Sequence, residues 1–228
     1  MPPTLKLTYM KKTTILLIAL FLTASFQGWA QDFKQAKISY DVEMDAEDMD
    51  PQAAMMMKDM KMVIAFQDEG TRMEMNMEMV NVVTIINSNE NKGVVLMDMM
   101  GMKMATPIED LEKMQEEQGG EEEMPEIRET GKTKKIAGYT CHQVFVKAED
   151  SKEEIEMWVA KEFVANDAAS MYSAKGLQGF PLEMDMDQDG AKMHLIATEV
   201  STKKLNKDMF NPEVPDGYTI NNMGGMGR

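Results

Sequence analysis

Between Met73 and Met79, methionine alternates with acidic or amide residues in the order Met-Glu-Met-Asn-Met-Glu-Met. Because the side chains of a β-strand point alternately to the two faces of its sheet, a strand here would present its thioethers on one face. Thioether sulfur is a soft donor that selects Cu(I), and methionine also adapts to irregular apolar surfaces. The pattern predicts a methionine surface, extended by a second methionine-rich segment. Its predicted residues are Met73, Met75, Met77, Met79, Met97 and Met99.

Three functions for this surface stay open. In the main hypothesis, the protein is not an enzyme, and the surface holds or shields an apolar ligand such as a lipid tail. The second hypothesis is a periplasmic carrier of Cu(I) or Ag(I) that uses the same thioethers, with His194 as an optional ligand. The third is a structural, envelope-associated protein whose sheet packs methionine in its core. The main hypothesis includes no metal and no cofactor.

A second candidate site is the segment Asp185–Gly190, whose acids at alternate positions and final glycine match the first half of a calcium loop. The second half does not match, because the twelfth position is Ile196 rather than a bidentate glutamate. A hairpin turn with Asp189 and Gly190 at its tip explains the segment better.

Cys141 and His142 stand next to each other and suggest a nucleophile with its base. Neighbouring residues on a strand point to opposite faces, so these two cannot form such a pair. Cys141 is the only cysteine, which excludes an internal disulfide and predicts a half-buried thiol. The common hydrolase, nucleotide-binding and zinc motifs are absent, and we expect no catalytic residues.

The N-terminus carries the marks of an export signal. Lys11 and Lys12 precede the apolar run 15–26, and small residues at Gly28 and Ala30 precede a cleavage point. Residues 1–30 therefore predict a cleaved signal peptide. The run is too short to span a bilayer, and no cysteine directly follows it for lipid attachment. We expect a soluble periplasmic or secreted protein without a membrane anchor.

The net charge of −15 excludes partners that are themselves polyanions. Removal of the signal peptide takes away three lysines and no acids, which makes the chain more negative still. Nucleic acid would be repelled rather than neutralised, and adhesion to anionic lipid through a basic patch is disfavoured. The charge mainly favours solubility.

Alternating patterns predict an α+β fold that is mostly β: a curved antiparallel sheet, or half-barrel, with two or three short helices packed on one side. Asp50-Pro51 predicts a helix to Met60, and Asn166 caps another that ends before Gly176. We expect one domain over 31–220, a mobile acidic insert at about 107–129 and a flexible tail at 221–228. The strands are predicted at 35–44, 61–67, 71–79, 82–86, 93–99, 135–147, 153–160, 181–187 and 191–201.

Four segments carry a resemblance to a known family. They are Thr-Gly-Lys-Thr-Lys-Lys-Ile-Ala-Gly-Tyr-Thr-Cys at 130–141, Met-Trp-Val-Ala-Lys-Glu at 157–162, Phe-Pro-Leu at 180–182 and Pro-Asp-Gly-Tyr at 215–218. From about Phe33 to Tyr218 the chain resembles the uncharacterised exported bacterial family known as domain of unknown function 4412. Such proteins look like lipoprotein-carrier-like half-barrels, in which a curved antiparallel sheet wraps an apolar cavity. This resemblance of architecture implies no particular function.

Overall fold

The computed structural model describes residues 32–44, 59–68, 70–109, 111, 124–147, 154–170, 172–188 and 191–221. These residues belong to one compact unit, Asp32–Arg228. The predicted signal peptide, most of the predicted helix at 50–60, most of the acidic insert and residues 222–228 lie outside the described residues.

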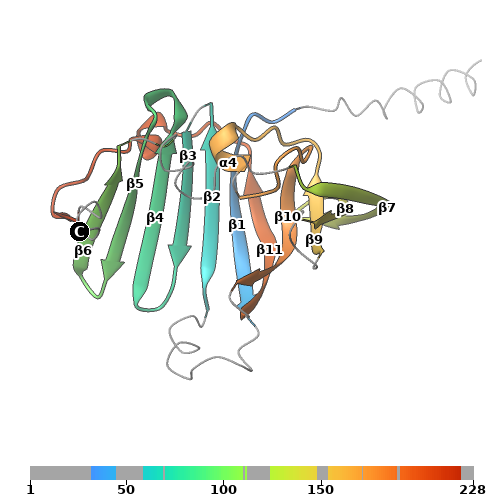
Figure 1. The fold of residues 1–228 in the computed structure, drawn as a ribbon, viewed down its shortest axis with the longest axis horizontal. Coiled ribbons are helices and arrows are strands. Elements are labelled where there is room, and N and C mark those ends of the chain that lie inside the picture. The colour runs from blue at the N-terminus through green and yellow to red at the C-terminus, as the bar shows by residue number, and fades with distance from the viewer. Residues whose placement is uncertain are drawn as a thin grey trace, which may run out of the picture. The chain divides into compact units, whose positions relative to one another are not determined.

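The described residues form one twelve-stranded sheet, most of which can be followed in Figure 1. Its order is β12-β6-β5-β4-β3-β2-β1-β11-β10-β9-β8-β7, and the two edges do not join. All neighbours are antiparallel except β12, which runs parallel to β6. The strands are β1 Gln35–Met44, β2 Lys61–Gln67, β3 Gly70–Asn76, β4 Val80–Asn87, β5 Lys92–Met99, β6 Met102–Ile108, β7 Glu126–Ile136, β8 Tyr139–Lys147, β9 Ile155–Ala160, β10 Phe180–Gln188, β11 Ala191–Ser201 and β12 Thr219–Ile220.

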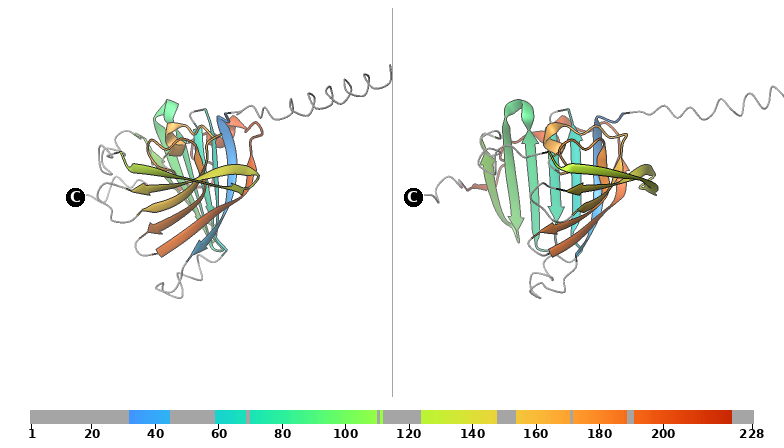
Figure 2. Two further views of the ribbon diagram at one scale, coloured as in Figure 1. Left: turned by 90° about the vertical axis from the view of Figure 1, so that its right-hand side faces the viewer. Right: turned by 45° about the vertical axis from the view of Figure 1, so that its right-hand side comes forward.

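The predicted fold class is confirmed: the protein is mostly β, with an open, curved sheet and few short helices. The predicted hairpins β2–β3, β4–β5 and β10–β11 are present with the pairing that alternation implies. Figure 2 shows the curvature, with β8–β11 turning away from the plane of β2–β6. We call the concave side, which carries α4 (Asp167–Ser170), the inner face.

Three strands were missed by the sequence analysis: β6 and β7, which belong to two-residue hairpins, and the two-residue strand β12. The β5–β6 turn is Met100-Gly101 and the β7–β8 turn is Ala137-Gly138, with positive φ at all four residues. Two consecutive residues of positive φ suit the twist of a hairpin, but asparagine, aspartate or glycine usually occupies the first position. Because methionine and alanine occupy the first position of these two turns, the sequence does not show them as turns. The last part of the predicted acidic insert lies in β7, which begins at Glu126.

The main core lies on the inner face at the centre of the sheet. Its largest fully buried side chains include Tyr40, Phe66, Phe163 and Phe180, and Tyr40 donates its hydroxyl hydrogen to the Pro181 carbonyl at 2.7 Å. The alternation of side chains along a strand explains this burial pattern, because every second residue of β1 and β2 is buried on the inner face. The core joins β1 and β2 to β8–β11.

The short helices lie on both faces of the sheet. On the inner face, the side-chain oxygen of Asn166 accepts a hydrogen bond from the Ala169 amide at 2.7 Å, which confirms Asn166 as the cap of α4. The helix is shorter than the predicted one. The 3-10 turn η3 (Lys207–Phe210) packs on the other face, against β3 and β4, and a further 3-10 turn, η2 (Ser88–Glu90), joins β4 to β5.

The outer face of β4–β6 has a second core of its own, made by Ile85, Val94, Leu96 and Ala105. Val214 and Tyr218, from the segment after η3, pack against it. The same segment continues into β12, which pairs with β6. One C-terminal segment therefore covers both the outer face and the free edge of this half of the sheet.

Candidate functional site

The inner face of β2–β6 carries a row of methionines, which we call the methionine row. The pairing register places one residue from each successive strand directly opposite the next. Side chains of directly opposed residues lie on the same face of a sheet. The row consists of Met62, Met75, Val82, Met97 and Met104.

A second row lies beside the methionine row, two residues closer to the β3–β4 and β5–β6 turns. Val80 faces Met99 across β4 and β5, and Met99 faces Met102 across β5 and β6. On the other side of the methionine row, Ile64, Met73, Thr84, Val95 and Thr106 form a third row. Within β2–β6, thioethers therefore come from four strands to the inner face, with valine in their place on β4.

Burial along the methionine row changes from the centre of the sheet outward. Met62 on β2 is 8% exposed and belongs to the main core. Met75, Val82, Met97 and Met104 are half-buried, and so are the neighbouring Met73, Thr84, Val95 and Thr106. The inner face of β3–β6 is thus apolar but incompletely covered, whereas the outer face of β4–β6 is closed by the C-terminal segment.

The predicted site residues are not all on strands. Met73, Met75, Met97 and Met99 lie on the inner face, as alternation requires. Strand β3 ends at Asn76, so Met77 and Met79 lie in the turn to β4, and Met79 is 42% exposed. The predicted set also omits Met62, Met102 and Met104. These three are found only from the cross-strand register, which the sequence alone does not give because it does not show which strands are neighbours.

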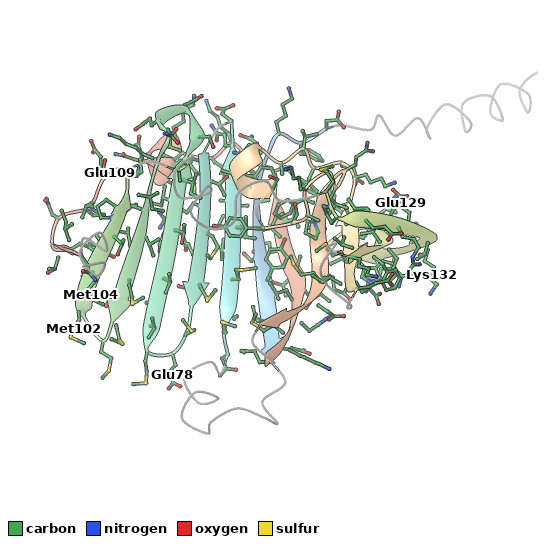
Figure 3. All side chains as sticks on the ribbon, viewed as in Figure 1. Glu78, Met102, Met104, Glu109, Glu129 and Lys132 are labelled. Atoms are coloured by element: carbon green, nitrogen blue, oxygen red, sulfur yellow. The ribbon has the colours of Figure 1, made fainter. Side chains whose placement is uncertain are left out.

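Sulfur is concentrated at one end of this half of the sheet. Figure 3 labels Met102, Met104 and Glu78, and shows yellow sulfur atoms gathered at the lower ends of the strands β3–β6. The β3–β4 and β5–β6 turns touch there, since the Met100 amide donates to the Met79 carbonyl at 3.3 Å. Met100 and Met102 are 74% and 60% exposed. An exposed group of large apolar side chains is typical of an interaction surface.

His194 cannot assist the methionine surface, which corrects its suggested role as a metal ligand. It alternates with Met193 and Leu195, whose side chains contact the main core, so it points to the outer face. There its Nδ1 lies 2.6 Å from the Asp185 carboxylate. Asp185, the first position of the calcium-loop match, is thus already engaged by a histidine.

The outer face of β7–β10 bears a polar network around Trp158. The Trp158 indole and the Gln143 amide both donate to one Glu156 oxygen, at 3.0 and 2.7 Å. Lys134 lies 4.1 Å from the centre of the Trp158 ring and forms a 2.6 Å ion pair with Glu183. These groups satisfy one another, which makes the network a stabilising feature of this face.

Cys141 is fully buried in the main core. Burial, together with the nearby Glu162 carboxylate, raises the pKa of its thiol to about 12. A thiol with such a pKa is protonated at neutral pH and is a poor nucleophile. The structure thus gives Cys141 a packing role, with its thiol buried more deeply than the half-buried position that the sequence predicts.

Within the described ranges, His, Cys, Asp and Glu form no group of three that could hold a metal ion. No helix in those ranges is both long enough and apolar enough to cross a bilayer.

Comparison with known families confirms the resemblance. Residues 48–218 match the family described as Domain of unknown function (DUF4412). The chain belongs to this family. No curated protein matches it.

Among solved structures, the chain is similar to PNGF-II in two structures, with 16% identity and TM-scores of 0.42 and 0.40. These matches cover 83% and 82% of this chain but only 31% and 30% of PNGF-II, so the chain spans less than a third of that protein. A beta-barrel-like protein of the DUF1849 family from Brucella abortus is also similar, with 9% identity and a TM-score of 0.36. That match covers 75% of this chain and 98% of the other.

Three of the four segments that carry the family resemblance, 130–141, 157–162 and 180–182, lie in or beside β7–β10. Tyr139 stacks against Phe163 at 4.9 Å between ring centroids, and Phe33 lies 5.5 Å from Phe163. Cys141 pairs with Ala160, which pairs with Phe180. The methionine-rich strands β3–β6 lie on the other side of β1, β2 and β11. Three of the family segments thus lie in the other half of the sheet from the candidate site, whereas the fourth, 215–218, packs through Tyr218 on the outer face of β4–β6.

Proposed function

We propose that this is an exported, non-enzymatic binding protein that holds a lipid-like apolar ligand on the inner face of β3–β6. The ligand lies along the methionine row and covers Met75, Val82 and Met97. The predicted signal peptide supports export. The third row, with Met73 and Val95, extends the same apolar surface toward α4.

One observation carries this proposal: the two faces of β4–β6 are covered to different extents. Both faces bear apolar side chains, and the C-terminal segment packs on the outer one. On the inner one, the side chains of the methionine row beyond β2 are half-buried. Covering apolar surface contributes roughly 25 cal/mol per Å². A ligand that covers this face would gain that free energy.

The chemistry of the face suits a flexible hydrocarbon chain. Methionine has three rotatable side-chain bonds and a polarisable sulfur, so the surface can follow an irregular ligand. The hydroxyls of Thr84 and Thr106 are the polar side-chain groups of the third row. With so few polar anchors, selectivity should be low among ligands of similar apolar size.

The test is native mass spectrometry of the gently purified chain, followed by solvent extraction and lipid analysis. We expect a bound mass that extraction identifies as lipid in the parent protein. Val82→Asp places a carboxylate in the middle of the methionine row, where an apolar ligand would leave it without a partner. Such burial of a charge costs several kcal/mol, so the bound lipid should fall to background.

Asn81→Asp provides the matched control. Asn81 is exposed and lies on the outer side of the same strand, so this variant adds the same charge without touching the methionine row. It should retain the lipid, and thermal unfolding should show that both variants fold. A clean apo mass for the parent protein, or equal lipid retention by Val82→Asp and Asn81→Asp, would contradict the proposal.

A further inference from the structure

Four thioethers share one face of the β5–β6 hairpin. Met97 faces Met104, and Met99 faces Met102, so the four form a two-by-two arrangement that we call the hairpin array. Opposed Cα atoms in an antiparallel pair lie about 4.5–5.5 Å apart, and residues two apart on one strand lie about 7 Å apart. Methionine side chains extend far enough to bring four sulfurs together above the centre of such an arrangement.

Core packing does not account for the hairpin array. Met102 is 60% exposed, and Met97, Met99 and Met104 are half-buried. Buried methionines elsewhere in the chain differ: Met157 and Met184 face each other across β9 and β10 at 4% exposure each. The hairpin array is therefore partly accessible to a solute from solvent.

The charges of the hairpin lie on its opposite face. Asp98 and Lys103 form the pair between the two methionine pairs, so their side chains point outward. Asp98 accepts a hydrogen bond from the Gly101 amide at 2.9 Å, and Lys103 lies 5.6 Å from the centre of the Tyr218 ring. No ammonium of the hairpin therefore repels a cation at the thioethers, and the net charge of −15 attracts one.

We propose that the hairpin array binds one soft monovalent cation, Cu(I) or Ag(I), through the sulfurs of Met97, Met99, Met102 and Met104. Neutral thioethers select soft ions, whereas Zn²⁺, Ca²⁺ and Cu²⁺ prefer thiolate, imidazole or oxygen ligands. The ion keeps its charge and oxidation state on binding. Binding should hold the β5–β6 turn more rigidly, because sulfurs from both strands share one ion.

This site goes beyond the proposed lipid function, although Met97 belongs to both. Exchange of methionine for leucine removes a sulfur donor but keeps the apolar bulk. Met99→Leu with Met102→Leu should therefore weaken ion binding while the lipid is retained. Val82→Asp should lose the lipid but still bind the ion, because it leaves all four sulfurs in place. The two proposals can thus fail separately.

The experiment is a calorimetric titration of the purified chain with silver nitrate in chloride-free buffer, with Cu(I) competition against a chromogenic chelator under anaerobic conditions as a second readout. We expect one tight equivalent. Loss of even an outer-shell partner of a metal ligand lowers metal affinity about tenfold or more. Met99→Leu/Met102→Leu and Met97→Leu/Met104→Leu should each weaken binding by at least that factor. The control Met157→Leu/Met184→Leu also removes two facing sulfurs and should bind like the parent protein.

Methyl NMR of protein labelled at the methionine ε-carbon locates the ion directly. One equivalent of Ag(I) should shift the four methyl signals of the hairpin array and leave those of Met157 and Met184 unchanged. The proposal is overturned by the absence of stoichiometric binding, by unchanged affinity in both hairpin variants, or by equal weakening in the control. Shifts confined to the exposed turn residues Met79 and Met100 would also overturn it.

Discussion

At the scale of single residues, the described methionines range from fully buried to largely exposed. Met157 and Met184 fill the main core, where a flexible side chain adapts to its neighbours. Met102 and Met100 are largely exposed at a turn, where packing gives them no stabilisation. Alternation in the sequence correctly predicts which face Met73 and Met75 occupy. It cannot predict exposure, because exposure depends on which other segments cover that face.

Cys141 permits a test of residue-level burial. Its thiol has a pKa raised to about 12, so the reactive thiolate is scarce in the folded protein below that pH and becomes commoner as the pH rises toward it. We expect the native protein to react with a chromogenic disulfide reagent at neutral pH far more slowly than the urea-unfolded protein. Because the chain has one cysteine, the unfolded sample is its own control. Equal rates in the two samples would refute the assigned burial.

At the scale of elements, turn chemistry decided which strands could be predicted. Hairpin β2–β3 was found because Asp68-Glu69-Gly70 is a recognisable turn sequence. Strands β6 and β7 were missed because Met100 and Ala137 occupy turn positions of positive φ that such side chains rarely adopt. In the β5–β6 turn, the Asp98 carboxylate accepts a hydrogen bond from the Gly101 amide, which stabilises the turn locally. The sequence pattern therefore predicted that these segments are strands better than it predicted where each strand begins and ends.

Gly70 permits a test of how η3 docks on β3. A Cβ atom at Gly70 would lie 2.6 Å from Cγ of the buried Phe210, too close for two carbon atoms. Gly70→Ala should therefore lower the free energy of unfolding by about 1–3 kcal/mol, the usual cost of overpacking. Chemical denaturation measures this.

In the Phe210→Ala background the aromatic ring is absent, so Gly70→Ala should lower the free energy of unfolding by much less. The difference between the two costs is the coupling between residues 70 and 210. An equal cost in both backgrounds would show that the Phe210 ring is not what requires glycine at this position.

At the scale of the whole molecule, the sheet has two halves that are stabilised differently. One half, β7–β11, shares the main core with β1 and β2. The other half, β3–β6, depends on the C-terminal segment for its outer face. The strand order that separates these halves was not predictable, because local patterns identify hairpins but not which hairpins adjoin. The pairing of β1 with β11 joins segments more than 140 residues apart in sequence.

Tyr218 permits a test of this division. It packs against the outer core of β4–β6, so Tyr218→Ala should destabilise that half locally. Hydrogen exchange should accelerate at the amides of β5 and β6, by roughly tenfold if about 1.4 kcal/mol of local stability is lost. Exchange in β8 and β9 should be unchanged. Uniform acceleration across all strands would instead show that the sheet opens as one cooperative unit.

The central β1–β11 pairing bears on how the chain acquires its structure. The first strand of the described fold cannot gain its second neighbour until Ala191–Ser201 has been synthesised, and β6 gains its last neighbour only with Thr219–Ile220. Contacts between distant segments slow folding, and unpaired strand edges with methionine-rich surfaces favour aggregation in the meantime. The unfolded chain should therefore need a holdase chaperone until β11 and β12 can pair with β1 and β6.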